Sequence, residues 1–206
     1  YKRSLNYKNV YNSQTTFMQP RNNKGSFIEN FSPDDYTPHI CESNGWQYFW
    51  SVQQDVDGLI NLVGGKERFT QKLDSMFTYN PSADEDLPIF STGMIGQYAH
   101  GNEPSHHVAY LYNYAGQPWK TQKRIRQMLK TWFRNDLMGM PGDEDGGGMT
   151  SFVVFSSLGF YPVTPGLPVY NIGSPLFTNT KITLDNGSIF EIDAQNASDE
   201  NKYIQS

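Results

Sequence analysis

Cysteine is almost absent from this sequence of 206 residues. The single cysteine, Cys41, has no partner within the chain, which excludes an internal disulfide framework. A lone cysteine could serve as a nucleophile, but an isolated thiol is more often a small packed residue. We therefore expect Cys41 to be buried.

Long apolar runs and clusters of basic residues are missing as well. No apolar stretch approaches the roughly 18 to 20 residues that cross a bilayer, and the first residues lack the apolar core of a secretory signal. The net charge is −5, whereas nucleic-acid binding needs clustered Lys and Arg. Basic residues gather only between Lys120 and Lys130, around a helical apolar stripe. We expect no membrane-spanning segment and no nucleic-acid partner, and any signal was removed or lies upstream.

Hydrophobic spacing predicts a mainly α-helical chain that ends in a β-rich segment. Glycines at positions 64, 116 and 159 stop apolar stripes of helical period. The predicted helices cover residues 45–63, 67–77, 105–115, 118–132 and 149–158, with a loop over residues 79–87. Residues 169–172 resemble a strand, and residues 181–192 resemble a β-hairpin. This change from predicted helices to predicted strands places a boundary between residues 1–164 and residues 165–206.

Three consecutive acids between glycines form the strongest local signal for chemistry. Asp143, Glu144 and Asp145 stand between Gly142 and a run of three glycines, just before an apolar helix. Glycines let a backbone approach a ligand closely and permit positive φ. In extended backbone, residues i and i+2 point the same way, so the two aspartates could share a target while Glu144 faces elsewhere. The alternative is an acidic surface turn that caps the helix.

A second polar loop runs from Gly101 to His107 and leads directly into a helix. Asn102 and Glu103 offer the hard oxygen ligands that Ca²⁺ prefers. His106 and His107 are adjacent on a helix, so their side chains point about 100° apart and do not readily chelate one metal. Helix capping and satisfied core histidines are the alternative interpretation.

The third candidate is Glu42, which lies among small and aromatic residues at the start of a helix. Trp46 could desolvate the Glu42 carboxyl, which would raise its pKa and suit it to general-acid work. A lone glutamate near a helix N-terminus could equally be a partner of the helix dipole. One carboxylic acid opposite one carboxylate base is the arrangement of inverting glycoside hydrolysis.

Several ordered stretches resemble family 92 glycoside hydrolases. They are Gly-Asn-Glu-Pro-Ser-His-His at residues 101–107, Pro-Gly-Asp-Glu-Asp-Gly-Gly at 141–147 and Leu-Gly-Phe-Tyr-Pro-Val at 158–163. The resemblance covers almost the whole chain. It implies that residues 1–164 form the C-terminal half of an (α/α)6 barrel and that residues 165–206 begin a β-sandwich, with the N-terminal part of the enzyme missing from this sequence.

The same resemblance implies a Ca²⁺-dependent exo-α-mannosidase that acts with inversion on mannose-containing glycans, as in N-glycan degradation. Glu42 would be the general acid, and Asp145 the general base with Asp143 assisting. The substrate-binding residues would be Trp46, Gln47, Glu103 and His106, and the metal ligands would be Asn102 and Glu103. By analogy with the family, the location would be periplasmic or secreted.

Two other functions stay open. The same loops could hold a sugar or an ion in a non-catalytic carbohydrate-binding or scaffold fragment. A metallohydrolase with His106 or His107 on a transition metal is the third hypothesis, although the remaining histidines, His39 and His100, form no recognised zinc pattern with them.

Overall fold

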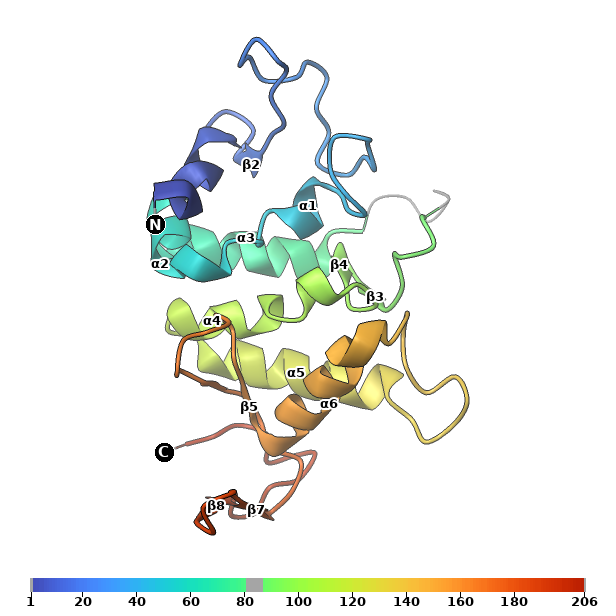
Figure 1. The fold of residues 1–206 in the computed structure, drawn as a ribbon. Helices are drawn as coiled ribbons and strands as arrows, with labels where there is room; N and C mark the ends of the chain where they lie inside the picture. Colours follow the sequence, from blue (N-terminus) through green and yellow to red (C-terminus); the bar gives the residue numbers. More distant parts are fainter. Residues whose placement is uncertain (1, 81–86, 206) are drawn as a thin grey trace. The chain divides into compact units, whose positions relative to one another are not determined.

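The chain is mainly helical in a computed structural model, which describes residues 2–80 and 87–205 (Figure 1). Helices account for 37% of the chain and strands for 12%, so the predicted class, mainly α with a small β content, is confirmed. Within the described residues, no helix combines the length and the apolar character needed to span a membrane. The predicted loop over residues 79–87 falls mostly outside the described residues.

Two compact units divide the chain. The first comprises Tyr1–Val108 together with Pro141–Asp143, and the second comprises Ala109–Met140 together with Glu144–Ser206. These compact units differ from the two parts predicted from the sequence, residues 1–164 and 165–206. The division into a barrel part and a β-rich part stays a prediction.

The first unit combines short helices with two small hairpins (Figure 1). Its elements, in chain order, are the 3₁₀ helix η1 (Lys2–Asn9), strands β1 (Tyr11–Asn12) and β2 (Phe17–Met18), helices α1 (Gly45–Tyr48), η2 (Gln53–Asp55), α2 (Val56–Leu62) and α3 (Lys66–Thr78), strands β3 (Met94–Ile95) and β4 (Tyr98–Ala99), and η3 (Glu103–Ser105). β1 pairs with β2 and β3 pairs with β4, both antiparallel. The predicted helix 67–77 is confirmed as α3.

The predicted single helix over residues 45–63 is wrong, because the chain interrupts it between α1 and α2. Asp55 has the non-helical angles of an N-cap (φ −152°, ψ 57°), and its carboxylate accepts a hydrogen bond from the Gly58 amide at 3.1 Å. The Tyr7 hydroxyl donates to the same carboxylate at 2.7 Å. Asp55 therefore starts a new helix and is held there by η1.

The core of the first unit is aromatic. Trp50 and Phe69 are fully buried and meet edge to face, with ring centres 5.4 Å apart. Phe49 packs on Trp50 in the same way at 4.8 Å. Such pairs contribute about 0.5–1.5 kcal/mol beyond the burial of their area, which ties the segment around α1 firmly to α3.

The second unit contains the longest helix and the β-rich end of the chain. It begins within η4 (Val108–Tyr110) and continues with α4 (Leu111–Tyr114), α5 (Pro118–Trp132), η5 (Asp145–Gly147), α6 (Gly148–Leu158), and strands β5 (Phe160–Tyr161), β6 (Asn171–Ile172), β7 (Asn179–Thr183) and β8 (Ile189–Asp193). The helix predicted from residue 105 starts later, at Leu111, after two 3₁₀ turns, and it ends before Gly116 as predicted. The predicted helix 118–132 is confirmed as α5.

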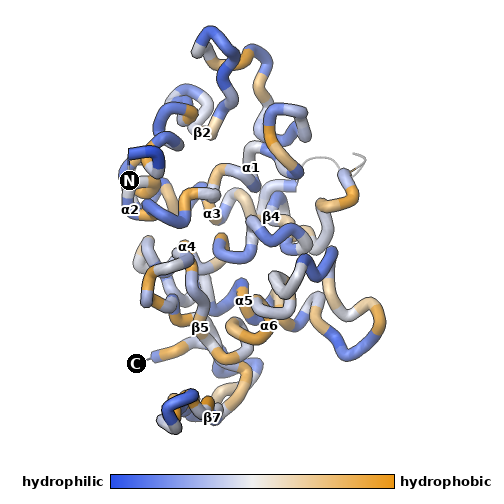
Figure 2. Tube along the Cα trace, in the orientation of Figure 1, coloured by the Kyte–Doolittle hydropathy of each residue, from blue (hydrophilic) through white to orange (hydrophobic). Residues whose placement is uncertain are grey.

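α6 and the following strands also match their sequence patterns. Figure 2 colours α6 largely as hydrophobic, and Gly159 ends it with φ 98°. The strand predicted over residues 169–172 is limited to β6, which pairs with β5. The predicted hairpin is confirmed, because β7 and β8 pair antiparallel in a five-residue register from Asn179–Asp193 to Thr183–Ile189.

Candidate active site

Glu42 lies in a short loop that leads into α1, and its backbone is in the left-handed region (φ 52°). Its side chain is exposed, while the next three residues are buried. Asn44 caps α1, because its side-chain oxygen accepts from the Gln47 amide at 3.1 Å and its side-chain nitrogen donates to Gln97 at 2.8 Å. The loop that carries Glu42 is thus fixed at its C-terminal end by Asn44.

A cavity of about 160 Å³ in the first unit brings Glu42 together with Gln47 and Asn102. The Asn102 side-chain nitrogen donates to the Glu42 carbonyl oxygen at 3.1 Å, across 60 positions of sequence. Cys41 also lines this cavity and is exposed, so the expectation of a buried thiol is wrong. Drug-sized ligands need roughly 300 Å³ or more, so the cavity suits a smaller group, such as one sugar unit or part of one.

Gln47 is held in a fixed orientation. Its amide oxygen accepts from the Ser43 hydroxyl at 3.3 Å, and its amide nitrogen donates to the Tyr36 hydroxyl at 2.8 Å. The Tyr36 hydroxyl also accepts from Ser91 at 2.7 Å. Both ends of the amide are therefore committed to neighbours that keep Gln47 at the cavity.

Trp46 lies on another side of α1. Its indole nitrogen donates to the Asp34 carboxylate at 2.8 Å, and its ring packs against Tyr79 and Phe17 with ring centres 5.3 and 4.8 Å away. Among the described residues, the lining of the 160 Å³ cavity includes Gln47 but not Trp46.

Glu103 opens η3 directly after Asn102 and is half-buried. Asn102 itself is buried, and Pro104 and Ser105 of η3 line the cavity. The predicted metal ligands Asn102 and Glu103 thus lie at or next to the cavity that contains Glu42. Among residues 2–80 and 87–205, however, no three His, Cys, Asp or Glu side chains gather closely enough to hold a metal ion.

His106 and His107 are both buried and uncharged near neutral pH. The His106 Nε2 lies 3.1 Å from the carbonyl oxygen of His100, and its ring stacks on His100 at 4.7 Å. The His107 Nε2 lies 2.8 Å from the Trp50 carbonyl oxygen. Burial lowers the pKa of each to about 4. Neither ring belongs to a group of three His, Cys, Asp or Glu side chains in the described parts of the chain, which disfavours the metallohydrolase hypothesis.

The acidic loop approaches the same region through Gly142. A Cβ at Gly142 would lie 2.3 Å from the Gly101 carbonyl oxygen, so only glycine allows this contact. Asp143 follows at once and is exposed. The first unit therefore contains Glu42, Asn102, Glu103 and Asp143.

Glu144 and Asp145 belong to the second unit, and their side chains have different environments. The Glu144 carboxylate accepts from the amides of Gly147 and Thr150 and from the Thr150 hydroxyl. These bonds, led by the hydroxyl, lower its pKa. Asp145 is exposed and has φ 49°. Glu144 is thus the N-cap of η5 and also binds Thr150 in the first turn of α6, while Asp145 is exposed.

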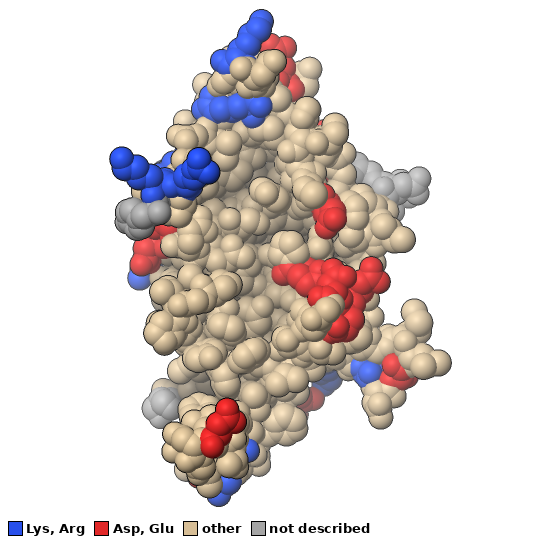
Figure 3. All heavy atoms as spheres, in the orientation of Figure 1, with Lys and Arg blue, Asp and Glu red and all other residues tan. Residues whose placement is uncertain are grey.

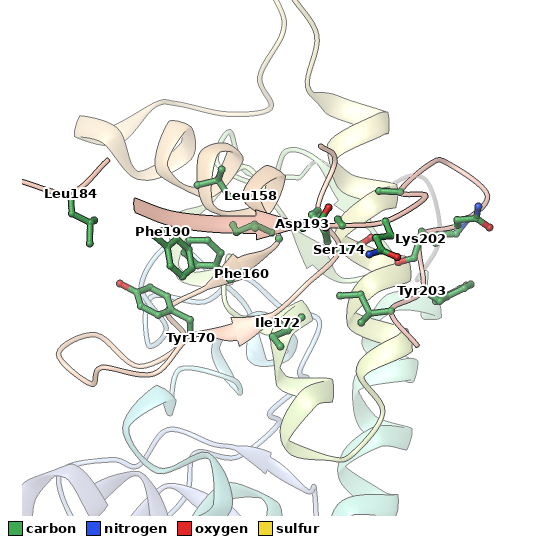
Figure 4. A pocket seen from close by; sticks show the side chains of 18 residues that line it. Leu158, Phe160, Tyr170, Ile172, Ser174, Leu184, Phe190, Asp193, Lys202 and Tyr203 are labelled. Carbon is green, nitrogen blue, oxygen red and sulfur yellow. The ribbon is translucent and has the colours of Figure 1, made fainter. Parts of the chain in front are cut away.

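The second unit contains an apolar cavity of about 680 Å³ (Figure 4). Phe160, Tyr170 and Phe190 cluster on one side of it, with ring centres of Phe160 and Tyr170 5.1 Å apart and those of Phe160 and Phe190 6.0 Å apart. No predicted site residue lines it. The sequence analysis did not predict this cavity. The apolar residues of the β7–β8 hairpin were the signal that could have indicated it.

Charge on the surface agrees with the composition. On the face drawn in Figure 3, the described Lys and Arg side chains stand in separate groups and form no continuous patch.

Comparison with known proteins gives the class of the chain. The model of the glycosyl hydrolase family 92 catalytic domain matches residues 1–206. The chain therefore belongs to this family. A relative from Arthroderma benhamiae, described as an uncharacterized secreted glycosidase, is 30% identical over 88% of the chain.

Two solved structures from Bacteroides thetaiotaomicron are similar throughout the chain. The family GH92 alpha-mannosidase BT3965 is 41% identical over 98% of the chain with a TM-score of 0.90. The inverting mannosidase BT2199 is 38% identical over 96% with a TM-score of 0.82. The chain spans 24% of the Arthroderma protein, 27% of BT3965 and 28% of BT2199, which is about a quarter of each relative.

Proposed function

We propose that the chain forms part of the catalytic region of an inverting exo-α-mannosidase that removes terminal α-linked mannose from glycans. The observation that carries the proposal is the seating of Glu42, whose loop lines a sugar-sized cavity and is fixed there by Asn102. Family members similar to the chain are named alpha-mannosidases, and one of them is named inverting. BT3965 has also been solved with mannoimidazole.

In the proposed reaction, Glu42 gives its proton to the glycosidic oxygen as the bond to the anomeric carbon breaks. Asp145, assisted by Asp143, accepts a proton from the water whose oxygen attacks the anomeric carbon from the opposite face. The products are mannose of inverted configuration and the free alcohol. An inverting enzyme leaves about 6.5–9.5 Å between the two carboxyl groups for this water.

The remaining proposed roles concern the sugar. Ser43 and Tyr36 use one acceptor and one donor of the Gln47 amide, so its second N–H or second lone pair would bond the sugar at the cavity. Glu103, Trp46 and His106 stay predicted substrate-binding residues. The burial of His106 and the bond of its Nε2 to the His100 carbonyl suit it to shaping the loop beneath the sugar.

We propose Ca²⁺ as the cofactor, with Asn102 and Glu103 as ligands. Their oxygens are of the hard type that Ca²⁺ prefers, and the Asn102 nitrogen is already bonded to Glu42, which leaves its amide oxygen for a ligand. Backbone carbonyls, water and sugar hydroxyls would complete the six to eight oxygens that Ca²⁺ takes. The ion would supply positive charge that orients the sugar hydroxyls.

The proposed architecture is half of an (α/α)6 barrel in residues 1–164, followed by the start of a β-sandwich in residues 165–206. Support for the second part comes from the hairpin β7–β8, since two strands alone are marginally stable in water. Its Phe190 is 47% exposed beside the 680 Å³ apolar cavity, as expected of a sheet face that packs on further strands. The description of the Arthroderma relative supports a secreted location, and a periplasmic location stays a prediction.

Mannose release from an aryl α-mannoside tests the function in a protein that contains residues 1–206. We expect release that chelator abolishes and Ca²⁺ restores, with inversion visible by NMR at the anomeric proton. Glu42→Gln and Asp145→Asn should each lower kcat by about 10²–10⁴-fold, the usual contribution of a general acid or base. Glu200→Gln, an exposed acid outside the predicted site, is the control and should keep full activity.

A carbohydrate-binding or scaffold role is the second candidate, because the chain spans only about a quarter of its relatives. Binding of an aryl mannoside without release, equal in the wild type and in Asp145→Asn, would support that role. It would overturn the proposed hydrolysis.

A further inference from the structure

Lys72 of α3 lies among three aromatic rings, two of which belong to α1 and its C-cap. The Lys72 Nζ on α3 is 3.3 Å from the ring centre of Phe17, 4.5 Å from that of Phe49 and 5.3 Å from that of Trp46. None of the described carboxylates forms an ion pair with it, and burial lowers the pKa of its amine to about 7. The proposed reaction does not use this half-buried amine, so its location needs another explanation.

Two of the three rings belong to the segment that carries the candidate site. Trp46 is in α1, and Phe49 is its C-cap residue. A helix of four residues has no stability of its own in water. α1 is capped by Asn44 at its start, and the rings of Trp46 and Phe49 contact Phe17 and the Lys72 ammonium.

We infer that Lys72 is a positioning residue whose ammonium, held by the faces of Phe17, Phe49 and Trp46, fixes α1 and thereby the placement of Glu42 and Gln47 at the cavity. A cation over an aromatic face is attracted by the ring quadrupole, and the attraction is strongest where water is excluded. A neutral side chain of the same length would fill the space without that attraction. α1 could then shift, and the loop that precedes it would shift too.

Catalysis gives the first test, which rests on the proposed function. Lys72→Met removes the charge and keeps the length, Lys72→Arg keeps the charge, and Lys66→Met changes an exposed lysine on the same helix. We expect Lys72→Met to lower kcat about 10- to 100-fold with a small change in KM, because small misplacement of a reacting group costs this much. Lys72→Arg should recover most of the loss, and Lys66→Met should match the wild type.

The thiol of Cys41 gives a second test that needs no activity. Cys41 is the only cysteine of the chain, is exposed and precedes Glu42 directly, so its labelling rate with a thiol reagent reports on this loop. We expect Lys72→Met to change the rate severalfold. Phe17→Leu, which removes the nearest ring, should change it similarly, and the double variant should show no further change.

The outcomes separate the two proposals. If the wild type releases no mannose but Lys72→Met and Phe17→Leu change the labelling rate, the proposed function fails and the positioning role stands. If Lys72→Met keeps the wild-type kcat and labelling rate, the positioning role is overturned. A loss of thermal stability and activity that Lys72→Arg does not rescue would also overturn it, because it would show a purely structural role.

Discussion

Glu42 and Asp145, the proposed acid and base, share a backbone conformation that side chains rarely adopt. They are two of five non-glycine residues with positive φ in the described parts of the chain. A Cβ in the left-handed region costs roughly 1–2 kcal/mol. Such strain persists where function requires a particular direction of the side chain. At both positions the strained residue is exposed, so packing does not explain the conformation.

This strain can be measured at Glu42 with two substitutions. Both Glu42→Ala and Glu42→Gly remove the carboxyl group, but only alanine keeps the strained Cβ. We expect the glycine variant to have a free energy of unfolding about 1 kcal/mol higher than the alanine variant, determined by urea titration. The same pair at Glu67, an exposed residue of α3, is the control and should show the opposite order, since glycine weakens a helix. Equal stability of the two Glu42 variants would show that the backbone is not strained there.

Among the elements, the sequence predicted the long ones well and the short ones poorly. α3 and α5 carry enough apolar repeats to define their period, so their bounds were predicted closely. The hairpins β1–β2 and β3–β4 have strands of two residues, which are too short for any alternation to show. The break before α2 depends on the side chain of Asp55, whose hydrogen bond to Tyr7 spans 48 positions.

The candidate site divides in the same way. Local sequence indicated which loops carry acids, but the extended backbone assumed for the acidic loop is wrong, because Glu144 is helical with φ −83° and Asp145 is left-handed with φ 49°. The hydrogen bond from Asn102 to Glu42 could not be predicted from spacing or composition, because it joins residues 60 positions apart.

A substitution at Gly142 tests whether the acidic loop contacts the backbone of Gly101. Gly142→Ala would add a Cβ 2.3 Å from the Gly101 carbonyl oxygen at a residue whose φ is already 77°. Gly25→Ala is the control in the same unit, because Gly25 has φ 84° but no atom within 4 Å of the added Cβ. Overpacking typically costs 1–3 kcal/mol, so Gly142→Ala should be less stable than Gly25→Ala by at least about 1 kcal/mol in thermal or urea unfolding. Similar losses for both variants would mean that the two backbones are not in contact.

At the scale of the molecule, the first unit keeps three imidazoles uncharged in its interior. His100 is stacked on His106, and burial lowers the pKa of His100 well below its ordinary value. His106 and His107 are bonded to backbone carbonyls and have a pKa of about 4. The interior of this unit therefore tolerates these rings only as neutral groups.

The stability of the chain should consequently fall in mild acid. Between pH 6.5 and 4, an unfolded histidine binds a proton that buried His107 does not, so protons favour the unfolded state and stability decreases as pH falls. Each such histidine contributes a slope of up to about 1.4 kcal/mol per pH unit. Urea unfolding between pH 7.5 and 4.5 measures this dependence. His107→Gln should reduce the slope, because glutamine does not titrate, whereas His39→Gln, which changes an exposed residue, should leave it almost unchanged. An identical slope in His107→Gln and the wild type would show that His107 is protonated equally in the folded and unfolded states. The buried imidazole of His107 would then not cause the acid sensitivity.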